Sequence, residues 1–147
     1  MKRSIALIVC LLLLIAAFPV AALADGPDLE VNALHFPDEN FRKYLVDQGY
    51  TSGNASAGYT ISQSKLEWIR GINVSDRDIS DLTGIEYFPN LIELYCASCK
   101  LTFLDVSENK LLRVLDCSGN QLTSLNVISC ANLEKLNCTN NKLSACM

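Results

Sequence analysis

Apolar residues in the carboxyl-terminal half of the chain recur at a fixed spacing, so this half is a tandem repeat. From residue 91 onward the pattern returns every 21 residues, and a weaker copy lies 22 residues further back. A period in this range predicts a solenoid, in which each coil contacts only its neighbours. The recurring apolar positions are Ile69, Ile72, Val74, Ile79, Leu82 and Ile85; Leu91, Leu94, Cys96, Leu101, Leu104 and Val106; Leu112, Leu115, Cys117, Leu122, Leu125 and Val127; and Leu133, Leu136, Cys138 and Leu143.

Each copy contains a short alternation of apolar and polar residues that predicts a strand. In residues 114–118, a period of two sends Leu115 and Cys117 to one face and the other three side chains to the opposite face. One coil cannot fold alone, because its apolar positions contribute ~1.5–3 kcal/mol each against roughly 1–2 kcal/mol of backbone entropy per ordered residue. Neighbouring coils must therefore stack.

The repeated motif, L-x-x-L-x-C-x-x-(C or N)-x-L, resembles the leucine-rich repeat of secreted and surface proteins of bacteria. The resemblance implies one short parallel strand per coil and a turn in which an Asn side chain bonds to the backbone. Asn120 and Asn141 hold that turn position, and Cys99 replaces Asn there. The predicted fold is an α/β repeat, a leucine-rich repeat solenoid of about 3.5 coils with a small helical amino-terminal cap.

Residues before the repeats carry helix signals typical of such a cap. Residues 36–45 combine a proline near the first turn, two acids at the positive end of the helix dipole and one apolar face. A second short helix is predicted after Ser62, a suitable N-cap, and runs through Trp68. Residues 48–59 are rich in Gly, Ser and Asn and predict a loop.

The predicted organisation has four parts. Residues 1–24 form a signal peptide, 25–34 a loose polar lead-in, 35–68 the helical cap, and 69–147 the solenoid with an incomplete last coil. The last coil ends without polar capping residues, although terminal repeats normally need them. Three explanations stay open: the last coil frays, the protein is a shortened relative of a longer one, or another chain covers the last coil. The third explanation offers a route to self-association.

A signal peptide is predicted from the first 24 residues. Lys2 and Arg3 precede an almost wholly apolar stretch, and Ala22-Leu23-Ala24 has the small-x-small form of a cleavage site. The alternative is a membrane anchor. Cleavage removes two basic residues and moves the net charge from −4 to −6. We expect a secreted or cell-surface protein without membrane insertion, whose acidic balance argues against nucleic acid as a partner.

Six cysteines follow the signal peptide, and the repeat pattern accounts for three. Cys96, Cys117 and Cys138 hold the same inward position in successive coils, where a thiol acts as a small apolar group. They are predicted to be reduced, because in-register parallel neighbours seldom have disulfide geometry. Zinc is the alternative for Cys96-x-x-Cys99, which has ligand spacing. The redox states of the remaining cysteines, Cys99, Cys130 and Cys146, stay undecided.

The segment between the two predicted cap helices can be compared with a 12-residue calcium-binding loop, whose ligands occupy fixed positions. Setting Ile61 at the apolar eighth position places Asn54, Ser56 and Gly58 at the first, third and fifth. Lys65 then occupies the position that needs a bidentate Glu. The loop has no carboxylate ligand, so no metal is predicted. No cofactor is predicted either.

Catalysis has no support in the residue pattern. His35 is the only histidine and precedes the cap helix, which removes Ser-His and Cys-His pairs unless His35 itself serves. No Gly-rich phosphate loop follows a strand. We therefore predict a protein that is not an enzyme.

The outward positions of the predicted strands offer a binding surface instead. The resemblance implies that this concave face binds a protein or peptide, with Tyr95 as its aromatic anchor. The alternatives are a structural or surface-layer spacer, a fragment of a larger repeat adhesin that binds nothing alone and, more distantly, an enzyme subunit whose chemistry lies on another chain. The predicted ligand-binding residues are Glu93, Tyr95, Val114, Asp116, Lys135 and Asn137.

Overall fold

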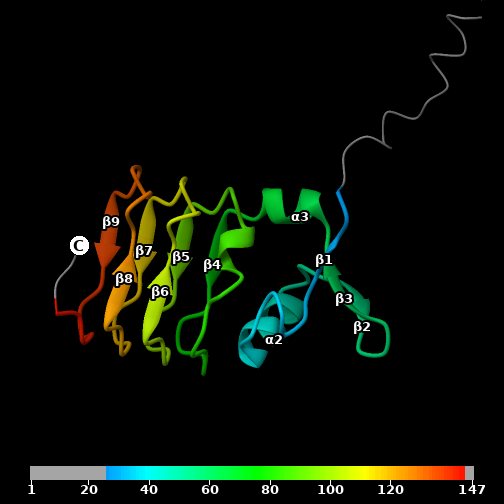
Figure 1. Cartoon of the computed structure of the whole chain (residues 1–147), viewed down its shortest axis with the longest axis horizontal. Helices are drawn as coiled ribbons and strands as arrows, with labels where there is room; N and C mark the ends of the chain where they lie inside the picture. Colours follow the sequence, from blue (N-terminus) through cyan, green and yellow to red (C-terminus); the bar gives the residue numbers. More distant parts are fainter. Residues whose placement is uncertain (1–25, 145–147) are drawn as a thin grey trace, which may run out of the picture.

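The computed structural model describes residues 26–144 of the 147-residue chain. The predicted signal peptide and Cys146 lie outside the described residues. An amino-terminal cap occupies one end of the molecule, and a row of stacked coils extends away from it (Figure 1). We name these coils first (residues 69–90), second (91–111), third (112–132) and fourth (133–144).

Two helices of the cap confirm the helix predictions. Helix α2 spans Glu39–Asp47 and begins at the N-cap Asp38, whose carboxylate accepts hydrogen bonds from the backbone N–H groups of residues 40 and 41. Helix α3 spans Gln63–Trp68 after the N-cap Ser62, whose hydroxyl accepts from the N–H of Lys65. These caps satisfy N–H groups that a helix leaves without partners at its first turn.

The cap also contains a three-stranded antiparallel sheet, so the predicted loop over 48–59 and the loose lead-in are both wrong. Strands β1 (Leu29–Glu30), β2 (Ser52–Asn54) and β3 (Gly58–Ile61) have the order β1-β3-β2. The strands are too short and too polar for an alternating pattern to be visible in the sequence. The buried side chains of Val31 and Ile61 anchor this sheet to the core.

The repeats form the predicted parallel sheet, with one strand from each coil. Its strands are β4 (Gly71–Asn73), β5 (Glu93–Tyr95), β7 (Val114–Asp116) and β9 (Lys135–Asn137), in the order β4-β5-β7-β9. Ile72, Leu94, Leu115 and Leu136 are directly in register across the four strands. We call this the four-stranded sheet.

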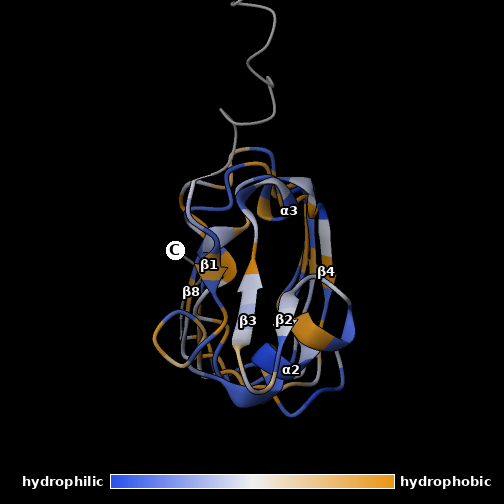
Figure 2. Ribbon diagram, turned by 90° about the vertical axis from the view of Figure 1, so that its right-hand side faces the viewer, coloured by the Kyte–Doolittle hydropathy of each residue, from blue (hydrophilic) through white to orange (hydrophobic). Residues whose placement is uncertain are grey.

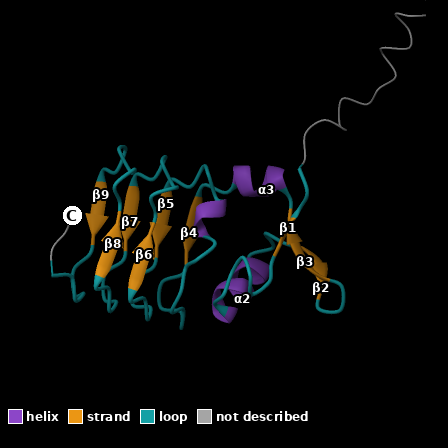
Figure 3. Cartoon of the chain, viewed as in Figure 1, coloured by secondary structure: helices purple, strands orange, loops and turns teal. Residues whose placement is uncertain are grey.

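A second parallel sheet, which the sequence analysis does not predict, joins β6 (Phe103–Asp105) to β8 (Ser124–Asn126). In the view from the cap end, β4 and β8 lie on opposite sides of the outline of the coils (Figure 2). The first coil has the 3₁₀ helix η2 (Ile85–Tyr87) and no strand in this second sheet. Outside these strands, each coil consists mostly of loops (Figure 3).

The core is a stack of apolar layers between the two sheets. Leu94 and Leu115 are 0% and 1% exposed, respectively, whereas Leu136 in the fourth coil is 42% exposed. The difference arises because Leu94 and Leu115 have a coil on each side, while among the described residues no coil follows β9. Position along the stack therefore decides how much a repeated leucine is buried.

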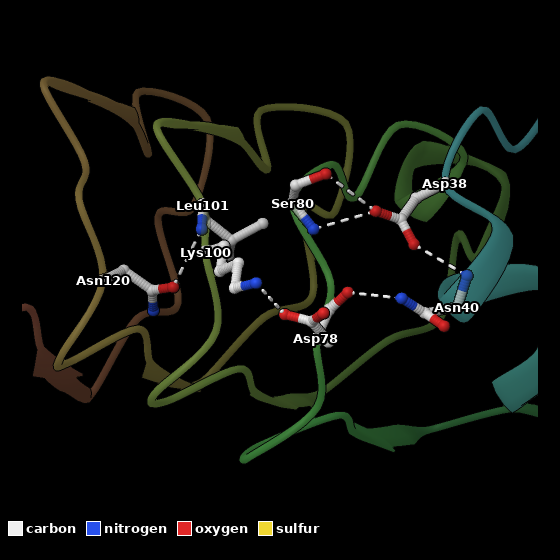
Figure 4. Close-up of polar contacts among 7 residues, drawn as sticks. All are labelled: Asp38, Asn40, Asp78, Ser80, Lys100, Leu101 and Asn120. Carbon is white, nitrogen blue, oxygen red and sulfur yellow. Dashed lines mark hydrogen bonds and ion pairs between the residues drawn. The ribbon is translucent and has the colours of Figure 1, made fainter.

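Polar contacts fasten the cap to the first coil. The Asp38 carboxylate accepts hydrogen bonds from the Ser80 N–H at 2.8 Å and hydroxyl at 3.0 Å, and the Asn40 side chain donates to the Asp78 carbonyl (Figure 4). Burial raises the pKa of Asp38, but the hydrogen bonds from Ser80, Phe41 and Asn40 outweigh it and hold the pKa below its ordinary value. Asp38 thus caps helix α2 and also links the amino-terminal cap to the first coil.

Tyr44 joins the cap to the first strand of the four-stranded sheet. Its hydroxyl accepts a hydrogen bond from the Asn73 N–H on β4 at 3.1 Å, and the Arg77 guanidinium lies 5.0 Å from the centre of its ring. Burial is the main cause that raises the pKa of Tyr44 to about 12. A neutral phenol therefore satisfies a backbone donor at the edge of the sheet, which edge strands otherwise leave open.

Replacing Leu115 by Ala should lower the free energy of unfolding by about 2–5 kcal/mol, because it opens a cavity in a layer closed on both sides. The matched change Leu136→Ala should cost about 1 kcal/mol or less, since that side chain is already partly in solvent. Urea unfolding followed by circular dichroism measures both. Equal losses would contradict the dependence of burial on neighbouring coils.

Asp38→Asn should destabilise the protein at pH 7, by about 0.5–2 kcal/mol, because a neutral amide is a weaker acceptor for the Ser80 and α2 donors. The folded-state pKa of Asp38 is depressed, so its stabilisation exists above the unfolded-state pKa and disappears as pH falls through the folded-state value. The difference between wild type and variant should therefore shrink from pH 5 to pH 2. Thermal unfolding across this range measures it, and a difference independent of pH would refute the assignment.

Candidate functional site

The six predicted binding residues lie together on the outer face of the four-stranded sheet. Glu93, Val114 and Lys135 are in register across β5, β7 and β9, and so are Tyr95, Asp116 and Asn137. Neighbouring strands lie about 4.8 Å apart, so the two rows form one continuous surface. The structure brings these residues together. That they bind a ligand stays a prediction.

Three of the six side chains on this face keep groups available to solvent. Glu93 is exposed and Tyr95 is half-buried, and the Tyr95 hydroxyl lies 3.5 Å from a Glu93 carboxylate oxygen, at the limit for a hydrogen bond. Among residues 26–144, neither Glu93 nor Lys135 takes part in a salt bridge. These two charges and the phenol ring are therefore free to meet a partner.

Asp116 and Asn137 are fixed more firmly. The Asp116 carboxylate accepts from the Ser118 N–H at 3.0 Å and hydroxyl at 2.6 Å, and from the Asn137 amide at 3.2 Å. Partial burial raises the pKa of Asp116, but the Ser118 and Asn137 hydrogen bonds outweigh it and lower the pKa overall. Asn137 in turn accepts from the N–H and hydroxyl of Thr139. Both side chains thus have a structural role in the turns after their strands.

The side chains at the predicted turn positions have the structural role that was expected of them. The Asn120 amide donates to the carbonyls of Cys96, Cys117 and Ser118, and its oxygen accepts from the Leu101 N–H. Asn141 makes the same set of bonds one coil later. At the corresponding position Cys99 donates through sulfur to the Val74 carbonyl at 3.2 Å. Each such side chain joins its own coil to the preceding one.

The inward cysteines occupy the predicted positions in the core. Cys96 and Cys117 are fully buried, and Cys138 is half-buried because no coil follows the fourth among residues 26–144. No disulfide joins the five cysteines in residues 26–144. Burial raises the pKa of the Cys96 thiol. In the same range there is no group of three or more His, Cys, Asp or Glu side chains that could hold a metal ion.

The segment considered for calcium binding has a different architecture from a helix–loop–helix. Asn54 closes the β2–β3 hairpin by accepting from the N–H groups of Ser56 and Ala57 at 3.0 Å. Lys65 lies in α3, with its ammonium 5.5 Å from the centre of the Trp68 ring. The oxygen of Asn54 is already used by the turn, and the cation of Lys65 belongs to another contact.

His35 lies in the cap, away from the four-stranded sheet. Its Nδ1 is 3.1 Å from the Glu30 carbonyl, and its ring packs edge-on against Tyr87. The described contacts of His35 include no Ser or Cys nucleophile.

Cavities also lie outside the predicted site, and two of them adjoin the first coil. One of about 240 Å³ separates the first coil from β6, and another of about 440 Å³ lies beside β4 and includes the 70% exposed Trp68. Sequence reasoning missed both, because they arise where segments distant in sequence diverge. Phe103 and Trp68 are large apolar residues outside the recurring apolar positions, and this is a signal that could have suggested the two cavities.

Within the described part of the chain, no helix has both the length and the apolar character needed to cross a membrane.

Comparison with known proteins agrees with the repeat geometry. The family of Leucine Rich repeats (2 copies) matches residues 110–146. Internalin J of Listeria monocytogenes serotype 4b (strain F2365) is 36% identical over 74 residues, which are 50% of this chain and 8% of that protein. The chain has the leucine-rich repeat fold of these bacterial proteins, and its residues 110–146 match the repeat family.

Solved internalin structures share the fold of this leucine-rich repeat protein. The functional domain of InlJ from Listeria monocytogenes, described as including a cysteine ladder, matches with a TM-score of 0.73 and 33% identity over 86% of this chain and 27% of that one. An internalin (inlF) from the same species matches with a TM-score of 0.63 and 23% identity, over 81% and 34%. The leucine-rich repeat protein thus spans about a third or less of these relatives.

Millimolar Ca²⁺ should leave the melting temperature of this leucine-rich repeat protein unchanged. The physical reason is the cation of Lys65 at the position of a bidentate acid and the prior use of the Asn54 oxygen by its turn. Thermal unfolding with calcium, and again with a chelator, makes the measurement. A rise of several degrees that the chelator reverses would contradict the prediction.

Proposed function

We propose that this chain is an exported, non-enzymatic protein-binding module that holds a protein or peptide ligand on the outer face of the four-stranded sheet. The observation that carries the proposal is the in-register surface of Glu93, Tyr95, Val114, Asp116, Lys135 and Asn137 over a buried leucine layer. Such a surface combines an aromatic anchor with charges of both signs on a backbone fixed by stacking.

The internalin-like fold is compatible with a protein-interaction module, and the named relatives support this class. Export is proposed from the signal-peptide pattern of residues 1–24. The concave shape of the binding face is likewise part of the proposal. Nucleic acid is not the expected ligand, because the chain is acidic and its outer sheet face has no cluster of Lys and Arg.

A structural spacer is the second candidate, and one observation favours it. Asp116 and Asn137 bond to each other and to their own turns, so part of the polar surface serves the solenoid itself. A spacer needs only that stabilising role. The two candidates differ in whether Tyr95, Glu93 and Lys135 contact another molecule.

Self-association through the fourth coil stays a prediction. The side chain of Leu136 is 42% exposed and Cys138 is half-buried, so the inner face of that coil has apolar surface that another chain can cover. Multiple copies would raise the apparent affinity of a weak ligand site.

The size of the sheet face predicts weak monovalent binding. Outward strand residues, about twelve at roughly 50 Å² each, bury ~600 Å², below the ~800 Å² per partner of a standard stable interface. Peptides selected from a displayed random library should therefore bind with dissociation constants of about 1 μM or weaker. Tyr95→Ala combined with Asp116→Asn should weaken this binding by about tenfold or more.

Isothermal titration of selected peptides tests the proposal, with Ser124→Ala on the opposite sheet as a matched control that should bind like wild type. Asp116→Asn is chosen because an amide oxygen can still accept from Ser118. Nanomolar binding by a demonstrated monomer, or full binding by the double variant, would show that the sheet face is not the site.

A further inference from the structure

The second sheet stops one coil short of the cap, which leaves β6 as an open edge. Residues 81–83 correspond by the repeat to β6 but form no strand. The backbone turns instead at Gly84, which has φ of +104°, into η2. Gly84 lies against the cap so closely that a Cβ atom there would be 2.2 Å from Phe36 Cδ1. Packing on the cap therefore keeps the first coil away from β6.

Backbone groups of β6 face this gap without partners. On this side the Lys100 N–H donates to the Ile79 carbonyl at 2.9 Å, but among the described residues no backbone hydrogen bond joins 80–86 to 101–108. The Val106 N–H and the Thr102 carbonyl bond to residues of the third coil. Backbone groups alternate in direction along a strand, so the N–H and C=O groups of Phe103 and Asp105 point to the open edge.

The gap is a cleft with an aromatic side and acidic walls. Its volume is about 240 Å³. Phe103, 55% exposed, lies on one wall, and no Lys or Arg lines the cleft. Its four acidic residues are Asp81, Glu86, Asp105 and Glu108. Lys110 pairs with Glu108 at 3.5 Å, but both side chains are 65% exposed and solvent screens the pair.

The next coil lacks these features at the same positions. Ser124 is in register with Phe103, and Asn126 with Asp105. The ring and the charge therefore belong to the cleft beside the first coil and are not a requirement of the repeat. Asp105 still closes its own turn by accepting from the Ser107 N–H, as Asn126 does with Ile128.

We propose that this cleft binds an extended cationic segment of a partner protein, laid along β6 as an added strand. The unpaired groups of Phe103 and Asp105 supply backbone hydrogen bonds, as in other cases of strand addition to a sheet edge. Alternating Arg or Lys side chains meet the carboxylates, and a guanidinium can stack on the Phe103 ring. This site is separate from the four-stranded sheet and adds a second binding surface.

The test uses an eight-residue peptide of alternating Arg and Val with blocked ends, titrated into the ¹⁵N-labelled protein. Backbone amide signals of 81–86 and 103–108 should shift, and the shifts should weaken as salt rises. A peptide with Glu in place of Arg should cause none. Absence of these shifts at about 1 mM peptide, or equal binding of the Glu peptide, would overturn the proposal.

Matched variants locate the contact. Phe103→Ser places at this position the residue that the next coil already carries, so the fold should tolerate it, and peptide affinity should fall about tenfold or more. Ile128→Ser, at an 86% exposed side chain outside the cleft, should bind like wild type. Tyr95→Ala should also leave this binding unchanged, which separates it from the sheet-face site. Unchanged affinity in Phe103→Ser would overturn the proposal.

Discussion

In-register stacking of the buried leucine layers is the constraint on which the rest of the structure depends. A single coil of about 21 residues orders too much backbone for the apolar area it can bury alone. Leu94 and Leu115 become fully buried only because a coil lies on each side of them, whereas Leu136 stays 42% exposed. Outward side chains such as Glu93 and Lys135 are exposed and lie outside this packing, so the fold leaves them available for binding.

The same stacking explains why polar side chains recur inside the turns. A short coil leaves carbonyl groups that its own strands do not use, and Asn120 and Asn141 satisfy those of their own and the preceding coil. Cys99 serves this position with a single, weaker sulfur donor. Each coil is therefore completed partly by the one that follows it, which couples neighbours beyond apolar contact.

Much of the solenoid could be predicted from the sequence, because its period repeats one physical requirement in every coil. Alternation around Leu115 placed the strands and their inward side chains correctly, and Ser62 marked the start of a helix. The cap sheet was missed because Ser52–Asn54 and Gly58–Ile61 lack an alternating pattern. The cleft beside Phe103 depends on the packing of Gly84 against Phe36, residues 48 positions apart that no local pattern connects.

Native-state hydrogen exchange of individual backbone amides tests the central role of stacking most directly. The account predicts that amides of β5 and β7 exchange only through global unfolding, while those of β9 exchange faster through local opening, because β9 has a neighbour on one side only. A gradient of protection that falls toward the fourth coil would agree. Equal protection in β5, β7 and β9, or faster exchange in β7 than in β9, would contradict it.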